Sequence, residues 1–303
     1  MTGINNLNLY HYGQSVFSKK FEEVILPQLN SIPFFKRFTV PLSKYEKKYQ
    51  NEEIIGIDYK HWYYNDEIFQ KYIQDIISLK PKYLLVFDNP FGFERPFEIE
   101  IERFAHKLFQ RTKILVEMIK NECPETILVS PNISVVPYDL KKIYANYLAS
   151  HHKCFDIYSV FCANDMNDMS IGMISSMLIE QQNIEKKPTW VFGAIPSSSS
   201  NIIGLKNGFL PLTDIQSVNK LKQLFKLFKE IDPNVKWFYF GLDIDLYHPD
   251  LQPESFAFWK DNLPAVFQLY ENNWDWIHFV GLIDHRESVK VDLVKALIDL
   301  TNG

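Results

Sequence analysis

The sequence predicts an α/β fold, a single (β/α)8 barrel that spans residues 1–303. A length of 303 residues suits one large α/β barrel. Eight short runs rich in apolar or β-branched residues have the character of strands, and helical patterns separate most of them. Eight βα units in about 250–300 residues is the arithmetic of this fold.

Several of the eight runs are apolar almost without interruption, as strands buried on both faces of a parallel sheet are. They lie at residues 7–11, 34–40, 54–58, 83–88, 126–130, 155–161, 189–193 and 237–243. A further extended piece is expected within residues 276–284, near the end of the chain.

Helices are expected between the strands, where apolar residues recur at near-helical spacing. They are predicted at 17–29, 66–78, 101–119, 138–150, 171–182, 215–228, 256–270 and 289–300. The link over residues 41–53 is short, so its helix is expected to be degenerate. A doubly wound open sheet is the rival architecture, but its Gly-rich first turn is missing, because residues 11–14 contain only Gly13.

Composition excludes several classes of protein. The chain is 46% hydrophobic, which excludes a disordered protein, and its 32 basic and 37 acidic residues argue against a nucleic-acid partner. Three cysteines suit neither a disulfide framework nor a zinc site. The sequence contains no uninterrupted run of about 18 apolar residues, so no membrane-spanning helix is predicted. Residues 1–12 lack a secretory pattern, so we expect a cytoplasmic protein, although a secreted chain trimmed of its leader would have the same N-terminus.

Aromatic residues make up 15% of the chain, with 24 Phe, 16 Tyr and 6 Trp. Two interpretations stay open: a Phe-rich core, or a pocket walled by rings. We expect most Phe to be structural, and we expect Trp62, Tyr63 and Trp276 to lie at the rim of the barrel mouth, because aromatic rings are common in the walls of small-molecule pockets.

Polar side chains follow most of the predicted strands, and in a barrel the active site lies at these carboxyl ends. A single Asp or Asn there is often only a helix N-cap, so the argument rests on the whole set. The candidates for substrate binding are His11, Asp58, His61, Trp62, Asn89, Asn132, Asp165 and Trp276, and the candidate catalytic carboxylates are Asp88 and Asp243.

Other constellations carry less weight. Asp243, Asp245 and His248 could form a metal site, but Pro249 indicates a turn, and we predict neither a metal nor a cofactor. The pair His151–His152 is expected to be a solvated surface pair. No Gly-x-Ser-x-Gly elbow and no dinucleotide fingerprint occurs.

Four short segments, at residues 83–90, 155–160, 187–193 and 281–284, follow one another in an order that resembles the clan-A retaining glycoside hydrolases. Residues 83–90 (YLLVFDNP) look like the fourth strand, which ends in Asn-Glu-Pro, and 187–193 (KPTWVFG) look like the seventh strand, which leads to the nucleophilic Glu. Residues 155–160 are similar to the sixth strand, and 281–284 to the ending after strand 8. The resemblance implies a carbohydrate-active (β/α)8 barrel.

The two expected glutamates are replaced: this frame puts Asn89 at the acid/base position and Gly193 at the nucleophile position. Asn89 cannot act as the acid, because an amide does not donate a proton at a useful pKa, and Gly193 cannot act as the nucleophile, because glycine has no side chain. Three explanations stay open. The frame is off by one and Asp88 is the acid; the pair has moved, for example to Asp88 with Asp58 or Asp243; or the barrel has lost hydrolysis.

The sequence therefore predicts a protein that acts on a carbohydrate, by hydrolysis or transfer of a glycosidic bond, with non-standard carboxylates. Its partner would be an oligosaccharide or glycoconjugate. The alternative is a catalytically inactive glycosidase-like barrel that binds a glycan or a protein.

Overall fold

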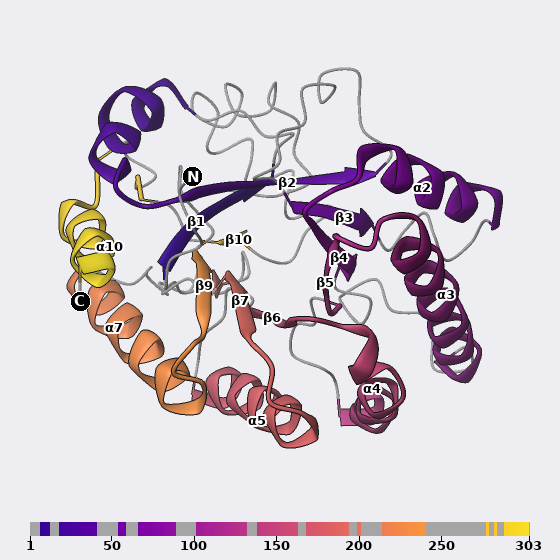
Figure 1. Cartoon of the computed structure of the whole chain (residues 1–303). Coiled ribbons are helices and arrows are strands. Elements are labelled where there is room, and N and C mark those ends of the chain that lie inside the picture. The colour runs from indigo at the N-terminus through magenta and orange to yellow at the C-terminus, as the bar shows by residue number, and fades with distance from the viewer. Residues whose placement is uncertain are drawn as a thin grey trace.

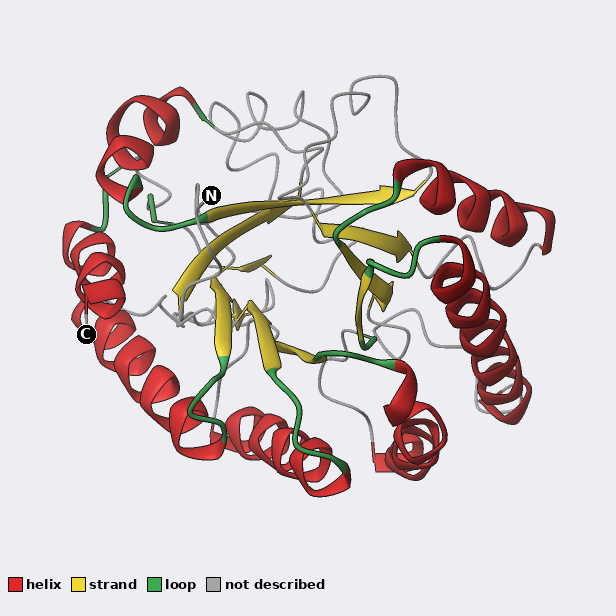
Figure 2. Ribbon diagram, viewed as in Figure 1, coloured by secondary structure: helices red, strands yellow, loops and turns green. Residues whose placement is uncertain are grey.

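A computed structural model gives the architecture, and it describes residues 7–12, 18–40, 54–58, 66–88, 101–131, 138–162, 168–193, 199–200, 214–239, 277–278, 282–283 and 288–302. Parallel strands lie at the centre and helices surround them (Figure 1). Figure 2 shows the same two layers coloured by secondary structure.

The parallel sheet has eight strands, in the order β5-β4-β3-β2-β1-β9-β7-β6. Every neighbouring pair in it is parallel. The strands are β1 (Leu7–Tyr12), β2 (Phe34–Val40), β3 (Ile54–Asp58), β4 (Tyr83–Asp88), β5 (Ile127–Val129), β6 (Tyr158–Cys162), β7 (Thr189–Gly193) and β9 (Lys236–Tyr239). Apart from shifts of one to three residues at some ends, these are the predicted strands; residues 240–243 of the predicted strand 237–243 lie outside the described residues. This confirms the (β/α)8 fold class.

The outer strands of this order, β5 and β6, meet through the parallel bridge between Val129 and Ile157. Asp156 supports the seam: its backbone N–H donates to the carbonyl of Leu128 (2.9 Å), and its Oδ2 accepts from the N–H of Leu128 (2.8 Å). The side-chain oxygen of Asp156 thus takes the place that a backbone carbonyl has in the hydrogen bonding between regular strands. For this reason regular β6 begins at Tyr158, three residues later than predicted.

The surrounding helices are α2 (Asp66–Leu79), α3 (Ile101–Glu122), α4 (Tyr138–His151), α5 (Asp168–Ile184), α7 (Asp214–Ile231) and α10 (Val291–Asn302). The helix predicted over 17–29 is irregular from residue 21 on, a π-helical turn η1 (Phe21–Ile25) followed by a 3-10 turn η2 (Leu26–Leu29). Pro27 lies in the first turn of η2, where it lacks the N–H that a continuing α-helix needs. The helix predicted over 256–270 lies outside the described residues.

Alternate residues of the strands belong to two separate apolar clusters. Leu7, Leu9, Ile55, Ile57 and Leu84 pack with the helices in the larger outer cluster. The smaller set, called the inner cluster from here on, consists of Tyr10, Phe35, Ile54, Tyr83, Leu85, Val129, Ile157, Trp190, Phe192 and Phe238. The period of two that a strand imposes on its side chains therefore separates barrel interior from barrel wall.

A short antiparallel pair supplements the barrel: β8 (Ser199–Ser200) pairs with β10 (Ile277–His278). It confirms an extended piece within the predicted stretch 276–284.

Candidate active site

The carboxyl ends of β3 and β4 bring two predicted site residues together. Asp58 and Asp88 are Cα partners in the parallel register between these strands. Neighbouring strands lie about 4.8 Å apart, so the two aspartates occupy adjacent positions at this end of the barrel.

An irregularity in the register creates this pairing. Gly56 pairs with Leu85, but two residues later Asp58 pairs with Asp88 rather than with Phe87, so β4 carries one extra residue. Val86 and Phe87 both pack, fully buried, in the outer cluster. Bulges of this kind re-aim strand residues beside active sites.

The other predicted residues fall as follows. His11 lies in β1, where it pairs with Lys36 of β2, so one strand separates it from β3. The remaining candidates lie outside the described residues: His61, Trp62, Asn89, Asn132, Asp165, Asp243 and Trp276. Tyr63, Asp245 and His248 lie there as well.

Gly193, at the predicted nucleophile position, has a backbone conformation that favours glycine. It is the last residue of β7 and has a φ of 85°. An L-residue in this left-handed region brings its Cβ close to the following carbonyl oxygen. The Gly193 carbonyl accepts a hydrogen bond from the indole Nε1–H of Trp237 (3.1 Å). The local backbone thus explains why glycine occupies the position.

In the described part of the chain, aromatic rings make up most of the barrel interior, which the sequence had indicated only in general terms as a Phe-rich core. Six of the ten members of the inner cluster are aromatic, where branched aliphatic residues usually dominate. Ring centroids lie 4.6 Å apart for Trp190–Phe238, 4.8 Å for Phe192–Phe238 and 4.9 Å for Tyr10–Phe192. A substantial part of the aromatic excess is therefore core. The alternation of Trp190 and Phe192 along one strand was the pattern that could have indicated it.

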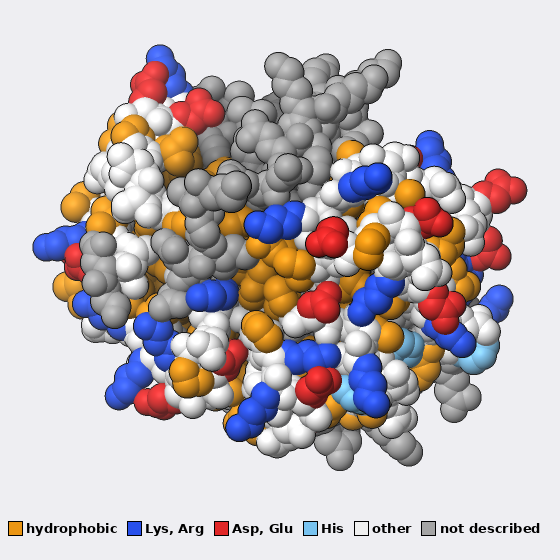
Figure 3. Space-filling view, in the orientation of Figure 1, with side chains coloured by type: hydrophobic (Ala, Val, Ile, Leu, Met, Phe, Trp, Pro, Cys, Tyr) orange, Lys and Arg blue, Asp and Glu red, His pale blue; other side chains and the backbone are white. Residues whose placement is uncertain are grey.

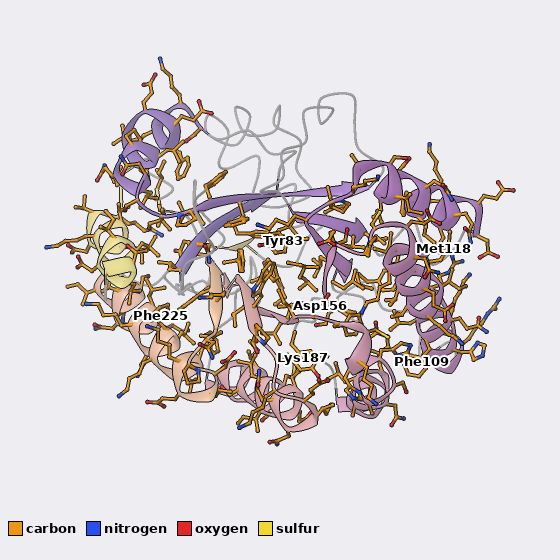
Figure 4. The ribbon with its side chains drawn as sticks, viewed as in Figure 1. Tyr83, Phe109, Met118, Asp156, Lys187 and Phe225 are labelled. Atoms are coloured by element: carbon orange, nitrogen blue, oxygen red, sulfur yellow. The ribbon has the colours of Figure 1, made fainter. Side chains whose placement is uncertain are left out.

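Lys187, the first residue of the segment 187–193, precedes the amino end of β7, whereas the candidate site is at the carboxyl ends of the strands (Figure 4 labels Lys187). Its ammonium donates to the carbonyls of His152 (2.6 Å) and Phe155 (2.7 Å), and it lies 3.0 Å from Glu185. Burial, and secondarily Glu185, raises the pKa of neighbouring Tyr158 to about 12. Lys187 thus ties β7 to the turn that precedes β6.

An ion pair between α2 and α3 was also missed by sequence reasoning. The guanidinium of Arg111 donates to the carboxylate of Asp66, the first residue of α2, and lies over the ring of Phe69 at 4.3 Å. The residue is only 5% exposed, and burial lowers the pKa of Arg111 despite the nearby carboxylate. Lys107, one turn before it, approaches the same carboxylate at 3.9 Å.

His151 is buried, so the prediction of a solvated His151–His152 pair is wrong for this member. Its ring stacks on Tyr147 at 4.8 Å and lies 5.3 Å from Phe109, and its Nδ1 lies 3.0 Å from the carbonyl oxygen of Tyr147. Burial lowers the pKa of His151, with the carbonyls of Tyr147 and Phe109 opposing the shift. The neighbouring helix α3 covers this histidine, which the local sequence could not indicate.

Among the described residues, no three His, Cys, Asp or Glu side chains lie close enough together to hold a metal ion. None of the helices within the described ranges has the length and apolar character needed to cross a membrane. Basic and acidic side chains are interspersed over the described part of the face in Figure 3.

Comparison with known proteins gives structural neighbours only. No protein-family model matches the chain, and no curated protein matches it in sequence. A GH10 endoxylanase from a sugarcane soil metagenome is similar in structure, with a TM-score of 0.61 at 9% identity over 98% of this chain and 97% of that one. A thermostable mutant of the xylanase Xyn10A from Cellvibrio japonicus has a TM-score of 0.60 at 10% identity, over 99% and 98%.

A third neighbour is the glycoside hydrolase BuGH86, solved in complex with neoagarooctaose. It has a TM-score of 0.55 at 11% identity, over 98% of this chain and 59% of that chain. At such identities the likeness is one of fold, the (β/α)8 barrel that the two xylanases have.

Proposed function

We propose that this protein hydrolyses or transfers a glycosidic bond in an oligosaccharide or glycoconjugate, at the carboxyl end of a single barrel that spans residues 1–303. Asp88 supplies one catalytic carboxyl, and Asp58 or Asp243 supplies the other. His11, His61, Trp62, Asn89, Asn132, Asp165 and Trp276 surround the sugar. The cytoplasmic location stays a prediction.

The observation that carries the proposal is the register pairing of Asp58 with Asp88. Retaining glycosidases need two carboxyl groups about 5–5.5 Å apart, and aspartates at paired positions of strands about 4.8 Å apart are close enough to reach that separation. Asp243 follows β9, which is separated from β4 by β1, β2 and β3. A pair of Asp88 with Asp243 would act from across the barrel mouth, and the wider spacing corresponds to inversion.

In the mechanism that we propose, one carboxyl of the pair donates a proton to the leaving oxygen. The other carboxylate attacks the anomeric carbon, and water then releases the sugar from this glycosyl intermediate. Two neighbouring carboxyl groups that share one proton supply both forms at once. Neither step requires a cofactor.

A second candidate function is glycan binding without hydrolysis. The backbone at Gly193 favours it, because a φ of 85° disfavours a glutamate where the resemblance places the nucleophile. The neighbours with a similar fold include one solved with an eight-sugar ligand, so oligosaccharides suit both candidates as probes.

Turnover and binding measurements test the two candidates together. The probes are a panel of aryl glycosides, xylo-oligosaccharides and neoagarooctaose, with calorimetry for binding and NMR of the anomeric product for stereochemistry. We expect Asp88→Asn to lose turnover by a factor of 10³ or more while binding persists, since a carboxyl of such a pair is essential to the chemistry.

The variants Asp58→Asn and Asp243→Asn identify the second carboxyl. Only replacement of the true partner of Asp88 should lower turnover by a factor comparable to that of Asp88→Asn. Asp299→Asn, on the exposed side of α10, is the matched control and leaves turnover unchanged. Tight glycan binding by a wild-type protein without turnover on the whole panel would establish the binding function instead. Neither binding nor turnover would refute both.

A further inference from the structure

The ion pair between Arg111 and Asp66 links the two helices that follow the candidate catalytic strands. Helix α2 follows β3, which ends at Asp58, and α3 follows β4, which ends at Asp88. Arg111 belongs to α3, and Asp66 is the first residue of α2. The two helices lie side by side along one flank of the barrel (Figure 1).

The pair joins these two βα units near the end of the barrel that holds the candidate site. Only seven residues lie between Asp58, the last residue of β3, and Asp66, the first residue of α2. At the opposite end of the units, the hydroxyl of Thr126 donates to the carbonyl of Pro81 (2.7 Å), and Cys123 Sγ lies 3.7 Å from the carbonyl of Ile77. Contacts therefore fix both ends of this flank.

Burial makes Arg111 an unusual choice for a purely structural contact. The side chain is almost completely enclosed, and its Nε has no hydrogen-bond partner among the described residues. The carboxylate of Asp66, by contrast, is exposed, with 87% of its side chain accessible. Enclosing a charge costs free energy that an apolar side chain packed on Phe69 would avoid, so stability alone does not require an arginine here. A planar cation with fixed donors supplies directional contact instead.

We propose that Arg111 is a positioning residue, which holds the start of α2 against α3 and thereby sets the spacing of Asp58 and Asp88. This inference rests on the proposed function. Arg111 does not touch the reacting groups: it acts through Asp66. A displacement of about 1 Å between catalytic groups can cost a factor of about 100 in rate.

Arg111→Met tests the proposal, because methionine keeps apolar contact with Phe69 and removes the charge. We expect kcat to fall by about 10- to 100-fold with little change in KM, and Arg111→Lys to recover part of the loss. Asp66→Asn should reproduce the loss, and the double variant should be no worse than either single variant. Arg103→Met, at an exposed site on the same helix, is the matched control.

Hydrogen exchange of the first two turns of α2 provides a readout independent of any sugar. We expect faster exchange there in Arg111→Met and in Asp66→Asn, with the exchange of α10 unchanged. A lowered melting temperature with kcat and α2 exchange both unchanged would show that Arg111 only stabilises the fold, and would overturn the proposal. If the wild type neither binds nor cleaves any sugar, the proposed function fails, and unchanged α2 exchange would additionally reject the anchoring by Arg111.

Discussion

Replacement of Gly193 by alanine tests the structural reason for the missing nucleophile. Gly193 ends β7 with a φ of 85°, where an L-residue pays about 1–2 kcal/mol of steric strain. The lower freedom of alanine in the unfolded chain offsets about 0.4–1 kcal/mol of this. We therefore expect Gly193→Ala to lower the free energy of unfolding by about 1 kcal/mol.

Gly172→Ala is the matched control, because it makes the same chemical change where the backbone accepts it. Gly172 lies in helix α5, is exposed, and a Cβ added there meets nothing within 4 Å. Alanine in a helix interior is favoured over glycine by about 0.8–1 kcal/mol, so we expect this variant to be more stable than the wild type.

Urea unfolding followed by circular dichroism measures both variants. The two substitutions should shift the unfolding free energy in opposite directions. A Gly193→Ala protein at least as stable as the wild type would refute the steric explanation for glycine at this position, because the backbone would then accept a Cβ without strain. For the same reason we expect Gly193→Glu to be destabilised and to gain no glycosidase activity.

Three further outcomes follow from buried groups away from the site. Lys187→Met should lower the free energy of unfolding by about 2 kcal/mol, because two carbonyls lose their charged donor; urea unfolding against the exposed control Lys186→Met checks it. Because burial lowers the pKa of His151, the unfolded state binds its proton more readily, so stability should fall as the pH drops through about 6.5. Urea titrations between pH 7.5 and 5.5 should show a smaller decrease for His151→Phe than for the wild type or His152→Phe; equal decreases would contradict this. Phe238→Ala should cost about 3–5 kcal/mol, and a loss below 1 kcal/mol would contradict a tightly packed aromatic interior.

The strands could be predicted almost residue by residue, because a strand buried on both faces leaves a continuous apolar run in the sequence. Residues 54–58, 83–88 and 189–193 were predicted with the bounds that the structure gives. Helix α5 was placed less well, beginning at Asp168 rather than at residue 171, because its apolar residues do not form one clear stripe.

The candidate site was predictable only as a set of strand ends. The extra residue in β4 that brings Asp88 opposite Asp58 leaves no pattern in the sequence. Val86 and Phe87 are both apolar, so the sequence looks the same whether or not the strand contains an extra residue. The ion pair of Asp66 with Arg111 joins residues 45 positions apart, and nothing local to either residue indicates it.

By itself, then, the sequence determined the alternation of strands and helices, and with it the (β/α)8 fold class. Local periodicity carries that information, since each element must bury its own apolar face. Tertiary structure alone decided which aspartate stands beside which, that rings such as Trp190 and Phe238 fill the interior, and that His151 is covered by α3. These are properties of register and packing between distant segments, which exist only once the strands have met.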